Sequence, residues 1–214
     1  TDTNATDVGD LAHMSIRPAG QSSAQYGYSS GSRDPGPSTP ANAIDKFPFA
    51  SDANATDVGV LSSRHSLAAG QSSTENGYTS GGDGLSSTIT IIDKFPFSSD
   101  TNSTDVGDIT QARKEVTGQS SDTSGYSSGG EAFHPSGYIR QNTIDKFPFS
   151  SDANATDVGD LTQARNGPSG QSSSTYGYSS GGEAPPVVNT IDKFPFAADA
   201  NATDVGDLAV SLRN

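Results

Sequence analysis

The chain has 214 residues, of which 30% are hydrophobic and 24 are glycine, and it contains no cysteine and no tryptophan. A typical globular chain is about 45–50% apolar, so the lower fraction in this chain excludes one large hydrophobic core. The lack of cysteine excludes disulfides, thiolate catalysis and cysteine-ligated zinc. The net charge of −13 argues against nucleic acid as a partner. Without a run of about 18 apolar residues, no membrane insertion is expected.

Four phrases recur along the chain and define its organisation. The phrase Ile-Asp-Lys-Phe-Pro-Phe begins at Ile44, Ile92, Ile144 and Ile191, at spacings of 48, 52 and 47 residues. Gly-Gln-Ser-Ser begins at Gly20, Gly70, Gly118 and Gly170, and Gly-Tyr-(Ser/Thr)-Ser-Gly begins at Gly27, Gly77, Gly125 and Gly177. Asn-(Ala/Ser)-Thr-Asp-Val-Gly begins five times, at Asn4, Asn54, Asn102, Asn154 and Asn201. The repeats predict a single domain over 1–214, with units of about 1–50, 51–98, 99–150 and 151–197 and a partial unit over 198–214.

Each unit is predicted to contain four short β-strands. In the first unit they lie, in chain order, at Asp7–Leu11, at Gly20–Ser23, around Gly27–Tyr28 and at Ile44–Phe49. Gly, Pro, Asn and Ser recur every few residues, which leaves no window of about ten residues for a helix. The apolar and aromatic residues come in short pieces bounded by turn residues, a pattern typical of strands. Pro48 cannot donate to a strand ladder and is expected at a strand end or edge.

A unit of this length with four strands has the size of one β-propeller blade. The order of the phrases resembles a kelch repeat: Arg165, a small-residue strand at Gly170, an aromatic strand ending in Gly181-Gly182, the Ile191-Asp192-Lys193-Phe194 strand and then Asp204-Val205. Valine stands near the place of the kelch tryptophan. We therefore expect an all-β fold, a kelch-like β-propeller of four four-stranded blades of about 48 residues plus a spare terminal strand. Because kelch rings usually close with six or seven blades, an open β-repeat array is the alternative.

The residue sequence of the repeat is also similar to that of uncharacterised repeat proteins of marine phages and metagenomes. This resemblance implies a non-enzymatic structural or adhesive protein, virion-associated or extracellular, that binds through variable blade loops. Its expected partners are other structural proteins, further copies of itself, or a surface glycan. The alternatives are a soluble carbohydrate-binding propeller, with one weak site per blade, and a filament-forming β-repeat subunit.

No enzyme is predicted from the serine-rich phrases. Gly-Gln-Ser-Ser occurs four times, and a catalytic serine is not normally present in four copies. Ser22, Ser72, Ser120 and Ser172 are therefore expected to be small residues that pack between blades. The kelch copper oxidases need a Cys–Tyr crosslink, and the absence of cysteine excludes that activity.

Aspartate and asparagine side chains recur together around the Asn-(Ala/Ser)-Thr-Asp phrase of each unit. Their oxygen atoms are the kind of ligand that Ca²⁺ prefers. The candidate ligands are Asp2, Asn4, Asp7, Asp52, Asn54, Asp57, Asp100, Asn102, Asp105, Asp152, Asn154, Asp157, Asp199, Asn201 and Asp204. The preferred interpretation is an Asx-turn, in which these side chains cap backbone amides between strands. No other cofactor is expected.

The units differ most between the Gly-Gly pair and the Ile-Asp-Lys phrase. The longest of these loops, Glu131 to Thr143, contains the candidate ligand-binding residues Phe133, His134, Tyr138 and Arg140. Loops on a rigid scaffold commonly carry binding residues, and aromatic side chains with arginine are common in recognition sites. The three histidines, His13, His65 and His134, are expected to be exposed in loops. Arg64, Arg113 and Arg165 occupy similar places in their units and are expected to be structural.

Overall fold

A computed structural model of the chain describes residues 4–32 and 42–211. Over these residues the regular structure consists of β-strands, and no helix is present that could cross a membrane. The strands form four four-stranded antiparallel sheets and one three-stranded antiparallel sheet. The predicted all-β class and the four-stranded repeat are therefore confirmed.

The four large sheets, sheet 1 to sheet 4, are meanders in which strands that follow one another pair side by side. Sheet 1 contains β1 (Ala19–Ser22), β2 (Tyr26–Ser30), β3 (Ala43–Pro48) and β4 (Thr56–Val60). Sheet 2 contains β5 (Ala69–Ser72), β6 (Asn76–Ser80), β7 (Ile91–Pro96) and β8 (Thr104–Asp108). Sheet 3 contains β10 (Thr117–Ser120), β11 (Ser124–Ser128), β14 (Thr143–Pro148) and β15 (Thr156–Asp160). Sheet 4 contains β16 (Ser169–Ser172), β17 (Tyr176–Ser180), β18 (Thr190–Pro195) and β19 (Thr203–Asp207).

The three-stranded sheet is an addition to sheet 3. It contains β9 (Arg113–Lys114), β12 (Glu131–His134) and β13 (Gly137–Arg140), with β12 in the centre. The hairpin of β12 and β13 is inserted between β11 and β14, which pair directly with each other. The insertion therefore leaves the meander of sheet 3 intact.

The sheets divide the chain differently from the sequence units. Each Thr-Asp-Val-Gly strand pairs with the Ile-Asp-Lys-Phe strand that precedes it, as in the pairing of Ile44 with Gly59. As a result the fifth copy of the phrase forms β19 and completes sheet 4. The first copy, at Asp7–Leu11, was predicted to be a strand but belongs to no sheet. The spare segment expected at the C-terminal end therefore lies at the N-terminal end.

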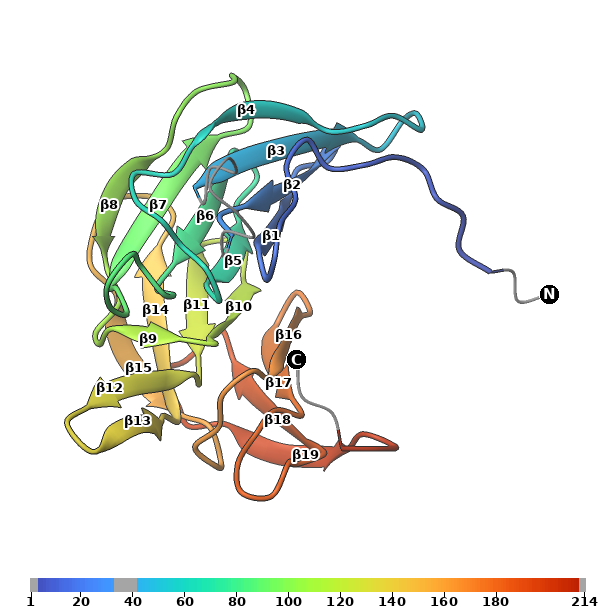
Figure 1. Ribbon diagram of the computed structural model, residues 1–214. Helices are drawn as coiled ribbons and strands as arrows, with labels where there is room; N and C mark the ends of the chain where they lie inside the picture. Colours follow the sequence, from blue (N-terminus) through green and yellow to red (C-terminus); the bar gives the residue numbers. More distant parts are fainter. Residues whose placement is uncertain (1–3, 33–41, 212–214) are drawn as a thin grey trace.

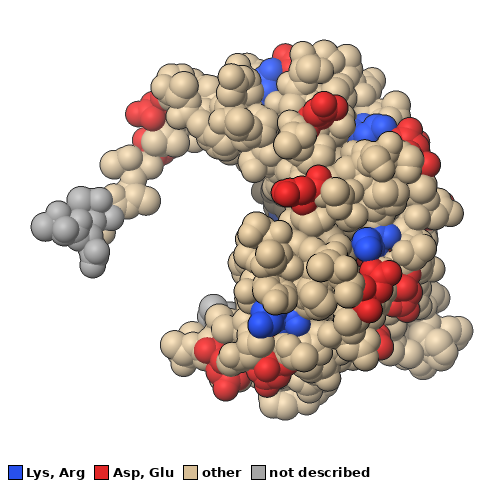
Figure 2. All heavy atoms as spheres, turned by 180° about the vertical axis from the view of Figure 1, so that it is seen from behind, with Lys and Arg blue, Asp and Glu red and all other residues tan. Residues whose placement is uncertain are grey.

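Sheets 1 to 4 follow one another around an arc, with the first strand of each sheet on the inner side (Figure 1). The inner strands are neighbours: β1 contacts β5, β5 contacts β10, and β10 contacts β16. Seen from behind, the space between the two ends of the arc is open, and acidic groups are scattered over the surface (Figure 2). Sheets 1 and 4 therefore each have one neighbour, whereas sheets 2 and 3 each have two.

Glycine and serine allow the inner strands to approach each other closely. A Cβ atom on Gly118 would lie 2.1 Å from the carbonyl oxygen of Gly70, and one on Gly70 would lie 2.3 Å from that of Gly20. Beside these contacts, a row of serine hydroxyls accepts backbone N–H groups from the preceding sheet. The pairs are Ser22 N to Ser72 Oγ at 3.0 Å, Ser72 N to Ser120 Oγ at 3.0 Å, and Ser120 N to Ser172 Oγ at 2.9 Å. These serines thus pack between sheets, as the sequence analysis expected.

Away from the inner strands, the sheets are joined by three aromatic clusters. Between sheets 3 and 4, Tyr126 packs on Phe194 and Phe196, with ring centroids 5.5 and 4.9 Å apart. Buried Ile144 and Leu161 complete this cluster. The same arrangement joins Tyr28 to Phe95 and Phe97, and Tyr78 to Phe147 and Phe149. The hydrophobic core of the molecule is therefore divided among the interfaces between sheets.

The contact between inner strands predicts a contrast between two equivalent glycines. Gly118→Ala should lower the free energy of unfolding by about 1–3 kcal/mol, because the new methyl group would collide with the backbone of Gly70. Gly20→Ala should change it by less than about 0.5 kcal/mol, because a Cβ atom there meets nothing within 4 Å. Urea unfolding followed by circular dichroism measures both, and equal losses would contradict close packing of the inner strands.

Candidate functional site

The candidate binding residues lie on the β12–β13 hairpin. Phe133 and His134 are in β12, and Tyr138 and Arg140 are in β13. Phe133 is directly opposite Tyr138, and Glu131 is directly opposite Arg140. Because side chains alternate along a strand, these two cross-strand pairs lie on the same face of the hairpin. The structure therefore brings three of the four predicted residues onto one face and places His134 beside the turn.

The aromatic pair is held in a fixed arrangement and remains open to solvent. The rings of Phe133 and Tyr138 are 5.8 Å apart in an edge-to-face geometry. Phe133 is 65% exposed and Tyr138 is 43% exposed. Lys114 Nζ lies 3.8 Å from the centre of the Tyr138 ring, a cation–π contact from the neighbouring strand β9. The face thus presents an aromatic edge next to a positive charge.

Arg140, a candidate ligand-binding residue, has protein partners for its guanidinium group in the structure. Its Nε donates to Asn166 Oδ1 at 2.9 Å, and its Nη2 pairs with Glu183 Oε1 at 2.6 Å. Both partners lie outside the hairpin, in the segments before β16 and after β17. Arg140 therefore fixes the hairpin against sheet 4, while Phe133 and Tyr138 remain available to a ligand.

Strand β9 fixes the other side of the hairpin. The guanidinium of Arg113 is fully buried, donates to the carbonyl oxygens of Gly129 and Thr143, and pairs with Asp145 Oδ2 at 2.6 Å. Ala132, opposite Arg113 in the ladder, is also buried. The aromatic pair is therefore mounted on a sheet that is tied to the interior of the molecule.

Glu131 is the acidic group at the base of this face. Its carboxylate lies 3.8 Å from Lys114 Nζ and accepts a hydrogen bond from Asn166 Nδ2 at 3.3 Å. Burial raises the pKa of Glu131, and the nearby charge of Glu115 raises it further, while Lys114 and Arg140 oppose these effects. Since the net shift is upward, the folded protein disfavours the ionised form of Glu131.

The equivalent loops of sheets 2 and 4 are shorter versions of the same ladder. In sheet 2, Asp83 bridges to Ser66 on one side and to Thr88 on the other. In sheet 4, Glu183 bridges to Asn166 and to Val187. The corresponding loop of sheet 1 includes residues 33–41 and lies mostly outside the described residues. Of the three loops that are described, the one in sheet 3 is extended into a hairpin with two aromatic side chains.

Twelve of the fifteen side chains proposed as calcium ligands, all but Asp2, Asn4 and Asp52, have protein partners that the structure shows. Asn54, Asn102, Asn154 and Asn201 each accept, through Oδ1, the backbone N–H of the outer segment of the preceding repeat, at 3.0–3.1 Å. Asp7, Asp57, Asp105, Asp157 and Asp204 each cap the glycine amide two residues later, at 3.0–3.1 Å. Asp100, Asp152 and Asp199 pair with Lys46, Lys94 and Lys146.

The caps that these aspartates place on the glycine amides are the contacts that the Asx-turn interpretation predicts, whereas the asparagines cap amides of the preceding repeat and the lysine pairs are ion pairs. Asp2 lies outside the described residues. Over residues 4–32 and 42–211, no group of three or more His, Asp or Glu side chains is placed to hold a metal ion. Calcium binding stays a prediction of the sequence alone.

Two of the histidines are not free loop residues. The expectation of exposure is wrong for His65, which is fully buried with Nε2 3.0 Å from Asp93 Oδ2. His13 is partly buried and its Nδ1 lies 2.9 Å from Asp45 Oδ1. Burial alone would raise the pKa of Asp93, but hydrogen bonds from His65 and Ser62 outweigh it and lower the pKa overall. His134, whose Nδ1 lies 2.7 Å from Ser136 Oγ, is exposed as expected.

The buried basic side chains that contact these aspartates form a series, of which the arginines alone were expected to be structural. Arg113 pairs with Asp145 at 2.6 Å, and Arg165 pairs with Asp192 at 2.5 Å. His65 occupies the same place in its repeat, eight residues after Asp57, so Arg64 is one residue out of register. In each case a loop that follows the outer strand of one sheet supplies the cation for an aspartate in the next sheet. These arginines are structural, as expected, and do not line an opening.

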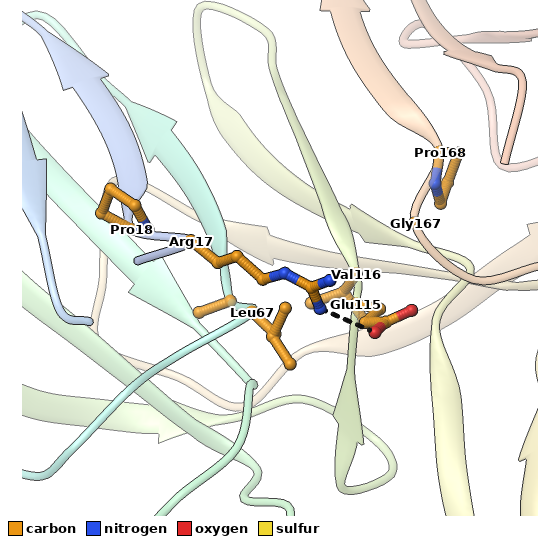
Figure 3. Close-up of a pocket in the computed structure, with 8 residues that line it drawn as sticks. Arg17, Pro18, Leu67, Glu115, Val116, Gly167 and Pro168 are labelled. Atoms are coloured by element: carbon orange, nitrogen blue, oxygen red, sulfur yellow. Dashed lines mark hydrogen bonds and ion pairs between the residues drawn. The ribbon is translucent and has the colours of Figure 1, made fainter. Parts of the chain in front are cut away.

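One further hollow lies where the loops before the inner strands meet. Its volume is about 190 Å³, and it is lined by Arg17, Leu67, Glu115 and Gly167 together with the residue that follows each of them (Figure 3). The backbone of these four residues is linked in series, from Leu67 N to Arg17 O, Glu115 N to Leu67 O, and Gly167 N to Glu115 O. Arg17 Nη1 pairs with Glu115 Oε1 at 3.2 Å. This hollow could not be predicted from the sequence, because the residue types at the four equivalent positions differ from one another. The positive φ that these four residues share is visible only in the structure.

No protein-family model matches the chain, and no similar protein was found among curated sequences. The residues of this chain and their geometry are therefore the basis for a functional proposal.

A buried ion pair should contribute more to stability than an exposed one of similar length. Arg165→Met leaves the buried carboxylate of Asp192 without its cation and should lower the free energy of unfolding by about 3–5 kcal/mol. Lys146→Met removes the pair with the exposed Asp199 and should cost less than about 1 kcal/mol. Chemical denaturation measures both, and a small loss for Arg165→Met would show that Asp192 does not depend on the guanidinium.

The raised pKa of Glu131 predicts a pH-dependent gain for Glu131→Gln. Below the ordinary pKa of glutamate, the side chain is protonated in both the folded and the unfolded chain, so the variant should match the wild type. As the pH rises from the ordinary pKa of glutamate to the raised folded pKa, the unfolded chain releases its proton more readily than the folded chain, so the wild type loses stability that the variant keeps, and the full loss is present above the folded pKa. Thermal unfolding of the wild type and the variant is measured at pH 7 and at about pH 4, and the difference in stability between the two proteins is compared at the two pH values. A less stable variant at pH 7 would mean that the contact with Lys114 outweighs burial.

Proposed function

We propose that the chain forms four blades of a kelch-like β-propeller and acts as a non-enzymatic structural or adhesive protein, on a virion or outside the cell. The arrangement of sheets 1 to 4 around an arc, with first strands innermost, supports the propeller assignment. The Gly-Gln-Ser-Ser and Gly-Tyr phrases then supply the inner half of each blade. The Ile-Asp-Lys-Phe and Thr-Asp-Val-Gly phrases supply the outer half.

The use of charged groups favours a structural role over catalysis. His65, Arg113 and Arg165 are fully buried against aspartates, where no substrate could reach them. The repeated serines accept backbone N–H groups from neighbouring strands and are part of the packing. These histidine, arginine and serine side chains are thus committed to holding the sheets together.

The observation that carries the binding proposal is the exposed pair of Phe133 and Tyr138 on an anchored hairpin. Aromatic residues are enriched at the centres of recognition surfaces, because they bury a large area at a small cost in side-chain entropy. The Lys114 charge beside Tyr138 adds a polar contact. We assign this face to a surface glycan. A lectin with one site per blade would need similar pairs in the other loops, and the corresponding loops of sheets 2 and 4 have none.

The proposal is tested by binding to an array of immobilised glycans. Phe133→Ala and Tyr138→Ala should each weaken the binding of the wild-type ligand by about 30-fold or more, the loss expected for a residue at the centre of an interface. Leu85→Ala is the matched control, because Leu85 is a highly exposed apolar residue in the equivalent loop of sheet 2. Unchanged binding in both aromatic variants, or an equal loss in the control, would exclude the hairpin as the binding site.

A further inference from the structure

Sheets 1 and 4 each expose the face that the other sheets bury against a neighbour. Tyr178 in sheet 4 is half-buried, whereas its equivalents Tyr28, Tyr78 and Tyr126 are buried under two phenylalanines of the next sheet. At the other end of the arc, Phe49 in sheet 1 is 56% exposed. The two uncovered faces are therefore the two halves of one interface that the molecule already contains three times.

On sheet 1, the two phenylalanine rings of this interface already have the arrangement that the equivalent rings have in an internal interface. The rings of Phe47 and Phe49 are 6.1 Å apart at an angle of 74°. The buried pair Phe95 and Phe97 has a spacing of 6.0 Å and an angle of 75°. A hollow of about 260 Å³ lies beside Phe47 and is also lined by Val8, Leu11 and Ala55. In the internal interfaces, the equivalent positions are packed against a tyrosine and an isoleucine of the preceding sheet.

The segment over 4–13 contacts sheet 1 as an outer strand would, although it belongs to no sheet. Asp10 O accepts the N–H of Ala55 at 2.8 Å, and Asp10 N donates to Asn54 Oδ1 at 3.0 Å. In sheet 1 itself, Val60 makes the same two contacts with Ser103 and Asn102 of the next repeat. The segment thus lies against sheet 1 as the outer strand of each sheet lies against the next sheet.

The same eight residues, Asn-Ala-Thr-Asp-Val-Gly-Asp-Leu, occur at 4–11, at 154–161 and at 201–208. In the copy at 201–208 they include β19, which pairs with β18 through Ile191 and Gly206 and is exposed along its whole length. A Cβ atom on Gly206 would meet nothing within 4 Å, whereas one on Gly159 of sheet 3 would meet the backbone of Ala200. Either segment can therefore pair with β18 through identical residues; residues 4–11 are packed against sheet 1, and residues 201–208 are packed against sheet 3.

We propose that this chain associates head to tail with a second copy of itself, with residues 4–11 of one copy replacing residues 201–208 on β18 of the other. The exchange costs no strand pairing, because the two segments are identical. It brings Tyr178 of one copy onto Phe47 and Phe49 of the other and fills the hollow beside Phe47 with Tyr178 and Ile191. The contact is heterologous, so it joins different faces of the two copies.

Residues 4–11 are the segment that stays in place because of a side-chain anchor beyond their end; each segment also has one backbone hydrogen bond to a neighbouring sheet, Ala55 N to Asp10 O and Ala202 N to Asp160 O, both at 2.8 Å. Two residues beyond Leu11, His13 pairs with Asp45 through its backbone N–H at 3.0 Å and its Nδ1 at 2.9 Å. Two residues beyond Leu208, the chain has Val210, which is exposed. In the associated state, Val8 then takes the role that Val58 has between sheets 1 and 2, and Val205 is released.

Matched substitutions in the two identical segments test the exchange. Light scattering on a sizing column, over a range of concentrations, should give the wild type a mass of at least two chains of 21.9 kDa. Val8→Asp should weaken association by about tenfold or more, since the charge would enter the apolar interface. Val205→Asp should leave association unchanged or strengthen it. Weaker association in Val205→Asp with none in Val8→Asp would overturn the exchange.

The direction of the contact is tested by mixing two defective copies. Phe49→Asp damages the face of sheet 1 and Tyr178→Asp damages the face of sheet 4, so each variant alone should have the mass of one chain. An equal mixture contains one intact face of each kind and should form a complex of two chains. A mixture that stays at one chain would overturn the head-to-tail contact, as would a wild type of one-chain mass at every concentration. Circular dichroism of each variant checks that it is folded, and Leu85→Asp is the control for a charge on a remote exposed site.

Discussion

The contact between each buried aspartate and the basic side chain from the preceding repeat is the interaction on which the arrangement of the sheets depends. Asp45, Asp93, Asp145 and Asp192 lie on the third strand of their sheets, with almost no exposed surface. Each also accepts the backbone N–H of a loop that comes from the preceding outer strand. A buried charge without a partner is very costly, so the loop has to reach the aspartate in every repeat. The pairs thereby fix how one sheet follows the next.

This constraint explains why the cation varies while the aspartate does not. Arginine reaches carbonyl oxygens as well as the carboxylate, as Arg113 does with Gly129 and Thr143. Histidine is shorter, and His65 reaches one carbonyl, that of Gly81. Both supply a donor to the buried carboxylate. The residue that supplies the charge can change so long as the loop brings a donor to that position.

The strands and the close packing of the sheets could be predicted from the sequence, because both depend on local residue types. Gly-Gln-Ser-Ser and Ile-Asp-Lys-Phe-Pro have turn residues on either side and few alternatives to a short strand. Which strand completes which sheet could not be predicted, because the strand at Asp57 is separated by connections of similar length from the strands before and after it. That choice is made by pairing between β3 and β4. The buried state of His65 was missed for a related reason, since its partner Asp93 belongs to another repeat.

The candidate site was predicted in its residues but not in its form. Phe133 and Tyr138 were predicted to bind a ligand because they are aromatic residues in a long loop. The sequence contains no signal that this loop pairs with β9. That pairing depends on Arg113, whose burial requires Asp145 in a strand more than thirty residues away. The anchoring role of Arg140 depends in the same way on Glu183 in the next repeat. Contacts between repeats therefore decide how the site is built.

The difference in size between the inner and outer residues of each sheet determines the curvature of the molecule. Neighbouring sheets touch through glycine and serine at the inner strands and through tyrosine and phenylalanine farther out. Each sheet therefore acts as a wedge, thin at its inner edge and thick toward its outer edge. The radius of the arc follows from the ratio of these two thicknesses. A chain with this repeat can thus change its radius through the volume of a few side chains, without altering a strand or a loop.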